Sequence, residues 1–413
     1  MRRTDYHIKS SAMFYALFLL SVVSIIIGGL FQLSSLNQQL EFKLELESIL
    51  ANNSKSGLVY AKAYFQELPL NQNTTIRLFN KGIDSVVISK RNWGAYQIIS
   101  SKAIHQSKQI TKIGLVGSQS QTVPPNLYLA DQGRPLSLCG KTKLEGQFEL
   151  PKSGVKRAYI AGQNYQGNKL LYGSKTDSEK QLPEINDELI LNLVTVPKSE
   201  WNSGVEEMVV PFDSVAVHLF STQPIYINSQ SFKGQIIIES EDSIIVSANA
   251  VLQDIILKSP KISIEENFKG NVQCIASETI MIQNNVILEY PSVLGVIETQ
   301  NNTISSSINI SSHVQIVGSV FLLSETPNFR IPIQLSIKEN SIINGFVYCD
   351  GQTELKGEIK GSLYTKSFYL KTASSAYQNH LLNATISNNL PVDFIPIPLL
   401  NESDNIKTIK WLN

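Results

Sequence analysis

The feature that most constrains the fold is a long uncharged stretch near the N-terminus. No charged residue occurs from Ser10 to Leu40, and residues 12–33 are almost wholly apolar. At about 1.5 Å per residue, a helix of that length spans about 33 Å, enough to cross a hydrocarbon core of about 30 Å. Inside a bilayer the backbone must satisfy its own hydrogen bonds. We therefore predict one transmembrane helix over residues 11–33.

The flanking charges predict an orientation for this helix. The apolar run is longer than the core of a signal peptide, so we expect an uncleaved anchor, with a buried core helix as the alternative. Residues 1–10 form a basic leader with Arg2, Arg3 and Lys9, and the first charge after the helix is Glu41. The positive-inside rule places this leader in the cytoplasm and the bulk of the chain in the periplasm or at the cell surface. The anchor residues are Ala12, Phe14, Leu17, Leu20, Val23, Ile26 and Leu30.

Helical spacing of apolar residues continues beyond the membrane and predicts an amphipathic stem over residues 34–68. An Asn-Asn-Ser sequence at 52–54 is expected to interrupt it. The apolar stripe fits packing on the next domain, or contact with a neighbouring anchor helix. Its members include Leu33, Leu36, Leu40 and Leu44.

Short strand-like segments follow the stem. Residues 74–80, 84–90, 95–101 and 109–116 are rich in β-branched and aromatic residues and are joined by short polar connections. Such connections are typical of antiparallel strands, so residues 74–117 are predicted to form a small antiparallel meander.

This order of elements resembles the type IV pilins and pseudopilins over residues 9–117. That family has a basic leader, an apolar helix that continues as a stem, and an antiparallel meander. Its processing motif combines a glycine with a glutamate five residues into the mature chain. Here residues 9–14 lack the glycine, and Leu17 stands at the glutamate position. The resemblance therefore concerns architecture, and implies pilus-assembly or other envelope partners bound through the stem.

The largest segment, residues 125–373, contains short isoleucine-rich runs without helical periodicity, such as Ile236-Ile237-Ile238. Runs of this kind favour a parallel β-solenoid, in which like side chains stack from rung to rung. An antiparallel β-sandwich is the alternative. The segment resembles the right-handed parallel β-helix families, including pectate-lyase-like and bactofilin-like proteins. Corner residues with positive φ are expected at Gly146, Gly234, Gly270, Gly318, Gly345 and Gly361.

Three further segments stand out around this solenoid. Residues 136–173 combine basic and aromatic residues. They form either the first rungs or a surface for a glycan or an acidic partner that includes Lys156, Arg157, Tyr159 and Tyr165. Residues 182–212 are acidic and are expected to leave the solenoid as an insertion. Residues 374–413 are expected to cap its end, with a short helix at 376–382.

The composition offers little support for catalysis. Lysine plus arginine equals aspartate plus glutamate at 35 each, so the formal net charge is zero and nucleic acid is not an expected partner. Aspartates are sparse in the solenoid, and the adjacent pair Glu265-Glu266 fits a solvated corner. The five histidines lack metal-ligand spacing, and no cofactor motif occurs. The three cysteines are expected to be small buried side chains.

The sequence therefore predicts a membrane-anchored structural or assembly protein with a rigid solenoid, and not an enzyme. The alternative is a carbohydrate-binding or carbohydrate-cleaving surface protein. A cleaving enzyme would need carboxylates about 5–10 Å apart in a groove of the solenoid, whereas a scaffold needs only a polar face.

Overall fold

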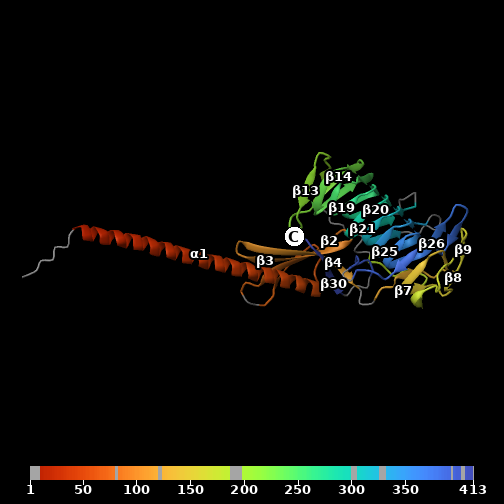
Figure 1. The fold of residues 1–413 in the computed structure, drawn as a ribbon, viewed down its shortest axis with the longest axis horizontal. Helices are drawn as coiled ribbons and strands as arrows, with labels where there is room; N and C mark the ends of the chain where they lie inside the picture. Colours follow the sequence, from red (N-terminus) through yellow and green to blue (C-terminus); the bar gives the residue numbers. More distant parts are fainter. Residues whose placement is uncertain are drawn as a thin grey trace, which may run out of the picture.

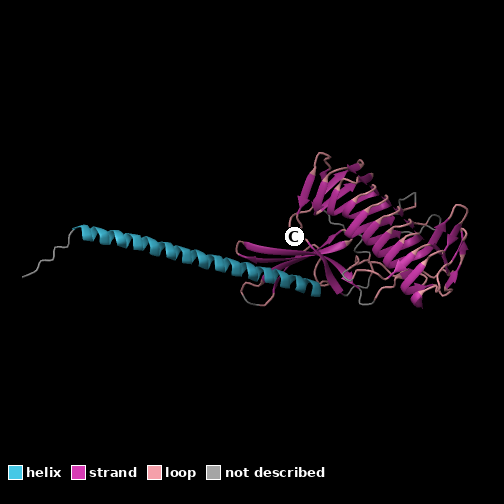
Figure 2. Ribbon diagram, viewed as in Figure 1, coloured by secondary structure: helices cyan, strands magenta, loops and turns pink. Residues whose placement is uncertain are grey.

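The computed structural model describes residues 10–79, 82–119, 123–186, 198–298, 305–324, 332–391, 394–400 and 405–412. The chain is mainly β with one long N-terminal helix, which confirms the predicted class (Figure 1; Figure 2). This helix, α1 (Ser10–Ala63), projects from the β-rich body, and only its C-terminal part lies against it. Arg2, Arg3 and Lys9 lie outside the described residues.

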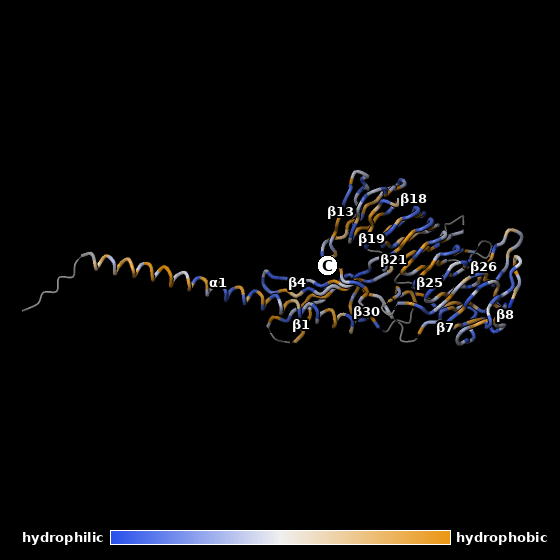
Figure 3. The backbone as a smooth tube through the Cα atoms, in the orientation of Figure 1, coloured by the Kyte–Doolittle hydropathy of each residue, from blue (hydrophilic) through white to orange (hydrophobic). Residues whose placement is uncertain are grey.

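The N-terminal half of α1 has no neighbour among the residues that the structure describes. It is long and apolar enough to cross a membrane, and its most apolar window is not buried against the rest of the described chain. Figure 3 shows the same stretch as almost continuously hydrophobic. Exposing so much apolar surface to water is unfavourable, and a lipid environment removes that cost. The exposed side chains include every predicted anchor residue, namely Ala12, Phe14, Leu17, Leu20, Val23, Ile26 and Leu30.

The C-terminal half of α1 packs on a sheet, and the predicted interruption at 52–54 is wrong. The helix continues because these polar side chains bond to the sheet instead of to their own backbone. Asn53 Nδ2 donates to the Ile83 carbonyl (2.5 Å), and Ser54 Oγ donates to the Ser101 carbonyl (2.7 Å). Gly57 permits the close approach, since a Cβ there would lie 2.2 Å from Ser101 Oγ.

The apolar stripe of the stem divides at Leu46. Leu46, Leu50 and Leu58 are buried against the sheet. The members of the stripe nearer the N-terminus have no partner among the described residues, and each is more than half exposed. These are Leu33, Leu36, Leu40 and Leu44. Packing on the next domain therefore accounts for the second part of the stripe only.

The sheet beneath α1 contains the predicted meander and the C-terminal strand. Its order is β1 (Asn73–Arg77), β2 (Ser85–Trp93), β3 (Tyr96–His105), β4 (Lys108–Gln119) and β30 (Asn405–Trp411), all antiparallel. β30 was expected to cap the solenoid and instead pairs with β4. The sheet packs on two sides: Val86, Ile88 and Ile99 are buried against α1, whereas Ile98 and Leu115, on the opposite face, are buried against the rest of the β body.

The remaining body is a network of parallel strands that closes on itself, here called the parallel stack. Because these pairings are parallel, the antiparallel sandwich is wrong for this segment. Its strands are β5 (Leu127–Leu129), β7 (Lys143–Leu150), β11 (Tyr172–Asp177), β12 (Lys198–Glu200), β13 (Glu207–Val210), β14 (Val217–Ser221), β15 (Ile225–Ile227), β16 (Ser231–Gly234), β17 (Ile236–Ser240), β18 (Ser243–Val246), β19 (Val251–Ile264), β20 (Lys269–Ile282), β21 (Ile287–Glu298), β22 (Ser307–Ile310), β23 (Gln315–Ser324), β24 (Gln334–Ile337), β25 (Ile342–Leu355), β26 (Glu358–Lys371) and β29 (Thr385–Ser387).

Buried side chains in the parallel stack pair like with like across successive strands. One column runs Ile225, Ile244, Ile262, Ile280 and Ile308. Each of these side chains is at most 1% exposed. Burying one such side chain contributes about 1.5–3 kcal/mol, so these columns are the main source of stability in the body.

The order of strands in the stack differs from their order in the chain. β5 and β7 pair with each other, and β5 also pairs with β26, near the other end of the sequence. Residues 136–173 therefore lie beside the strands from the C-terminal part of the chain, and the prediction that they form the first rungs of a solenoid is wrong. β12 and β13 pair with β14 and β16, so residues 198–210 belong to the stack and do not leave it as an insertion. Residues 187–197 of the predicted insertion lie outside the described residues.

The segment expected to form a helical cap is extended. β27 (Ala376–Gln378) forms an antiparallel pair with β26, and β28 (His380–Leu382) lies in a three-stranded sheet with β6 (Leu136–Cys139) and β8 (Val155–Arg157). Pairing with β6 supplies backbone partners that a short isolated helix would lack. A separate two-stranded sheet contains β9 (Tyr159–Ile160) and β10 (Gln163–Asn164).

Glycines allow neighbouring strands to approach closely, and residues with positive φ allow the chain to turn. Gly318, Gly345 and Gly361 are register partners in adjacent strands, and a Cβ on any of them would lie within 2.0 Å of a neighbouring backbone oxygen. Of the six predicted glycine corners, Gly270 and Gly318 lack a positive φ, whereas Gly146, Gly234, Gly345 and Gly361 have one. A second set of turns uses non-glycine residues with positive φ, namely Asn267, Asn285, His313 and Asn340.

Gly361→Ala tests the close approach of neighbouring strands. Gly361 has φ +140°, and an added Cβ would lie 2.0 Å from the Gly345 oxygen. We expect the free energy of unfolding to fall by about 3 kcal/mol or more, measured by urea denaturation of the detergent-solubilised chain. Gly204→Ala is the control, because only a side-chain atom at 3.2 Å lies near it. Equal stability of the two variants would contradict this packing.

Candidate functional site at the junction of the sheet and the parallel stack

The turn between β2 and β3 inserts against the parallel stack. Gln273, which is 4% exposed, accepts a hydrogen bond from the Ala95 amide (2.8 Å) and donates to the Trp93 carbonyl (3.0 Å). Gly94 at the tip has φ +59°, and a Cβ there would lie 2.2 Å from Gln273 Oε1. The turn sequence Trp-Gly-Ala thus fits a slot in which one glutamine bonds to both sides of the glycine.

Trp93 and Asp254 join the two bodies directly. The Trp93 indole donates to the Asp254 carbonyl (3.2 Å), and its ring meets Phe212 edge-on at 5.4 Å between centroids. Asp254 has φ +60° and is the extra residue at a register shift in β19. A bulge of this kind redirects a side chain out of the regular alternation. Here it directs the Asp254 carboxylate toward the C-terminal strand.

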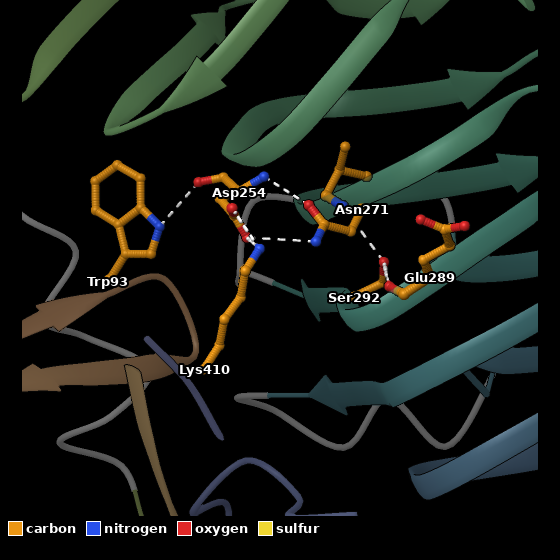
Figure 4. Close-up of polar contacts among 7 residues, drawn as sticks. Trp93, Asp254, Asn271, Glu289, Ser292 and Lys410 are labelled. Carbon is orange, nitrogen blue, oxygen red and sulfur yellow. Dashed lines mark hydrogen bonds and ion pairs between the residues drawn. The ribbon is translucent and has the colours of Figure 1, made fainter. Parts of the chain in front are cut away.

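Lys410 of β30 completes the contact. Its ammonium group lies 2.8 and 2.6 Å from the two oxygens of Asp254 (Figure 4). Asn271 accepts from the Asp254 amide (2.6 Å) and donates to its carboxylate (3.3 Å). The Asp254 side chain is 11% exposed and that of Lys410 is 31% exposed. The charged pair is therefore only partly screened by water, which makes it stronger than an open surface pair.

Beyond Asn271, a serine side chain links β20 to the next strand, β21. Ser292 Oγ lies 3.3 Å from the Val272 amide, which donates to it, and donates in turn to the Glu289 carbonyl (2.5 Å). Ser292 is the register partner of Gly318, where the glycine column begins. We call Trp93, Asp254, Asn271, Gln273 and Lys410 the junction site.

Arg91 forms a second connection beside the junction site. Its guanidinium donates to the Phe212 carbonyl (2.5 Å) and to Gln235 Oε1 (3.2 Å). Burial lowers the pKa of Arg91, but an arginine stays charged over the physiological range. The contact therefore places a half-buried cation on two neutral oxygens, which links the sheet to the parallel stack.

The junction site has no room for a ligand. The cavity among its side chains has a volume of about 10 Å³, sufficient for about one water molecule. Its carboxylate, amides and indole are already bonded to one another. This arrangement can fix two bodies in one orientation, and it offers no open position for substrate.

Other titratable groups cluster around single carboxylates. Glu239 lies 2.7 Å from His218, 3.3 Å from Lys198 and 3.4 Å from Lys258. Burial alone would raise the pKa of Glu239, but the two lysines outweigh it and leave that pKa below its usual value. Burial lowers the pKa of His218 more than Glu239 raises it. A carboxylate kept ionised by two lysines does not act as a general acid.

Glu354 has a similar environment, with Lys338 at 3.0 Å and Lys356 at 3.2 Å. A polar surface hollow of about 980 Å³ includes Asp131, whose carboxylate accepts from the backbone amides of Gly133 and Lys152.

Within the described ranges, no three His, Cys, Asp or Glu side chains are placed to hold a metal ion. Glu265 and Glu266 are exposed at a turn.

The cysteines are buried and unpaired, as expected: Cys139, Cys274 and Cys349. Burial raises the pKa of the Cys349 thiol to about 11, so it carries little thiolate at neutral pH.

The predicted partner surface is brought together in part. The Arg157 guanidinium carbon lies 6.0 Å from the Tyr165 ring centroid. Tyr159 is 65% exposed on the neighbouring two-stranded sheet. Lys156 is exposed on β8.

The sequence analysis missed the junction site. Asp254 and Lys410 are 156 positions apart, and each resembles an ordinary surface residue. The connection between residues 84–90 and 95–101 was predicted only as a short link between two strands. A large indole at the tip of a tight turn was the one local signal, because an exposed tryptophan there would be unfavourable.

Comparison with known proteins identifies no relative. No protein-family model matches the sequence, and no match was found among curated proteins or solved structures.

Lys410→Met tests the junction site, because it keeps the alkyl chain and removes the cation. We expect the uncompensated Asp254 carboxylate to reduce the stability of β30 by about 1–2 kcal/mol. Amide hydrogen exchange of residues 405–411 should accelerate accordingly. Lys407→Met, on the same strand and exposed, is the control. Unchanged exchange in Lys410→Met would contradict the assigned contact.

Proposed function

We propose that this chain is a membrane-anchored, extracytoplasmic assembly or scaffold protein with a pilin-like plan. The observation that carries the proposal is the division of α1 into two parts. Its N-terminal part is apolar and touches no other part of the described chain, and its C-terminal part packs on an antiparallel sheet. A helix of 54 residues that is held at one end only is suited to insertion in a membrane and to packing beside similar helices.

The orientation follows from charge. Arg2, Arg3 and Lys9 precede the anchor, and no charge follows until Glu41. The positive-inside rule favours a cytoplasmic N-terminus, with the sheet and the parallel stack outside.

The exposed leucines of the stem provide a surface for assembly. Leu33, Leu36, Leu40 and Leu44 are 53–65% exposed and recur at helical spacing on one side of α1. Leu33 is the last residue of the predicted anchor, and the other three follow it. They would therefore lie just outside the membrane, where adjacent anchored chains could touch. A helix from a second anchored chain would cover them.

The parallel stack would serve as the rigid module that the anchor carries. We interpret it as a right-handed parallel β-helix, supported by its columns of isoleucine and its aligned glycines. A scaffold role is consistent with the charges around Glu239 and Glu354, since two lysines lie beside each of these carboxylates. Glu239 and Glu354 each face lysines, whereas glycoside cleavage uses two carboxylates.

Cysteine cross-linking tests the assembly proposal, because all three native cysteines are buried. In membranes, Leu40→Cys should form disulfide-linked dimers under mild oxidation, since the exposed stripe would face a second stem. Gln38→Cys, which lies on the opposite side of the helix and is also exposed, is the control. Non-reducing electrophoresis of membrane fractions gives the readout.

Two outcomes would contradict the proposal. One is recovery of the full-length chain in the soluble fraction without detergent. The other is equal cross-linking at positions 38 and 40, which would indicate random collision instead of a stem interface.

A further inference from the structure

We propose that the end of the molecule opposite the membrane anchor binds an anionic polysaccharide. The surface is the segment 151–171, here called the distal flap, which contains β8, β9 and β10. Figure 1 shows β8 and β9 at the end of the body farthest from the free part of α1. This inference goes beyond the scaffold role, and its test does not depend on assembly through the stem.

The distal flap has a local charge that the whole chain lacks. It contains Lys152, Lys156, Arg157 and Lys169 and no acidic residue, although the chain as a whole has zero formal charge. Lys156, Arg157 and Lys169 are exposed and form no ion pair with any other residue that the structure describes. The neighbouring Lys143, by contrast, lies 2.6 Å from Glu145. The uncompensated cations create a positive field at this end of the protein.

Arg157 is held in position with most of its donors free. Its guanidinium lies over the Tyr165 ring and donates to the Asn168 carbonyl (3.4 Å). Tyr165 in turn donates to the Lys169 carbonyl (2.5 Å). A guanidinium has five N–H donors, so several remain for a carboxylate or sulfate. Because the ring already orients it, less side-chain entropy is lost on binding.

Tyr159 adds an apolar contact surface to these cations. Its side chain is 65% exposed, and it lies opposite Asn164 across the β9–β10 pair. An aromatic ring with a hydroxyl can contact the C–H face of a sugar and still reach water. The flap therefore alternates ring faces, amides and cations within a short segment.

This combination fits a polyuronate better than an acidic protein segment. A polyuronate offers carboxylates on rings that themselves have C–H faces, so cations and tyrosines are used together. An acidic peptide would use the cations and leave Tyr159 without a partner. The position of the flap, away from the membrane, also makes it accessible to an extended polymer.

The test measures binding of the full-length chain, in a neutral detergent, to immobilised alginate by biolayer interferometry. Dextran is the neutral polymer and polyglutamate is the acidic polypeptide. We expect binding to alginate that weakens with salt, and little binding to dextran or polyglutamate. The double variant R157Q/K169Q should weaken alginate binding at least about tenfold. Tyr159→Ala should also weaken it while leaving every charge in place.

K55Q/K407Q is the matched control, because both lysines are exposed and lie on the stem and the membrane-side sheet. It should bind alginate like the native chain, and circular dichroism should show that all variants are folded. Three results would overturn the proposal: no alginate binding, equal loss in K55Q/K407Q and R157Q/K169Q, or polyglutamate binding as strong as alginate binding. The last result would reassign the flap to an acidic protein partner.

Discussion

The architecture depends on one antiparallel sheet that packs against α1 on one face and, at one end, against the parallel stack on the other face. Adjacent residues of β3 face opposite ways, so Ile99 packs under α1 while Ile98 packs toward the parallel stack. Burying both faces removes more apolar area from water than a single-sided sheet could. The same constraint couples α1 to the stack, because neither can move without exposing one face of the sheet. The apolar contact alone does not fix an orientation. The directional hydrogen bonds of Arg91, Gln273 and the Asp254–Lys410 pair fix how the sheet sits on the stack.

The C-terminal strand makes this coupling depend on the whole chain. β30 enters the sheet beside β4, and its Lys410 reaches the bulge at Asp254. Residues 405–411 thus connect the sheet, which comes from the N-terminal part of the sequence, to the stack, which comes from its middle. Closing such a long loop costs conformational entropy, which the buried pairings around β30 must offset. The parallel stack shows the same feature, since β5 pairs with β26.

Sequence reasoning succeeded where the signal was local. Uncharged apolar length predicted α1, β-branched runs predicted the strands of the meander, and isoleucine triplets predicted parallel stacking. It failed where the outcome depended on distant partners. Nothing near Asp254 indicates Lys410, and nothing near residues 127–129 indicates β26. The interruption expected at Asn53 and Ser54 was wrong because their hydrogen-bond partners lie in the sheet. The turns at Asn267, Asn285 and Asn340 had a recognisable signal, since asparagine tolerates positive φ, but glycine was given more weight.

The most direct test of the double-sided sheet is a distance measurement between the stem and the stack. Spin labels at Ser48→Cys on α1 and Ala248→Cys in the turn before β19 are both exposed, and the native cysteines are buried. Double electron–electron resonance on the full chain in lipid nanodiscs should give one narrow distance distribution, because the sheet fixes both bodies. A broad or bimodal distribution would show that the stem and the stack move independently and would contradict this account.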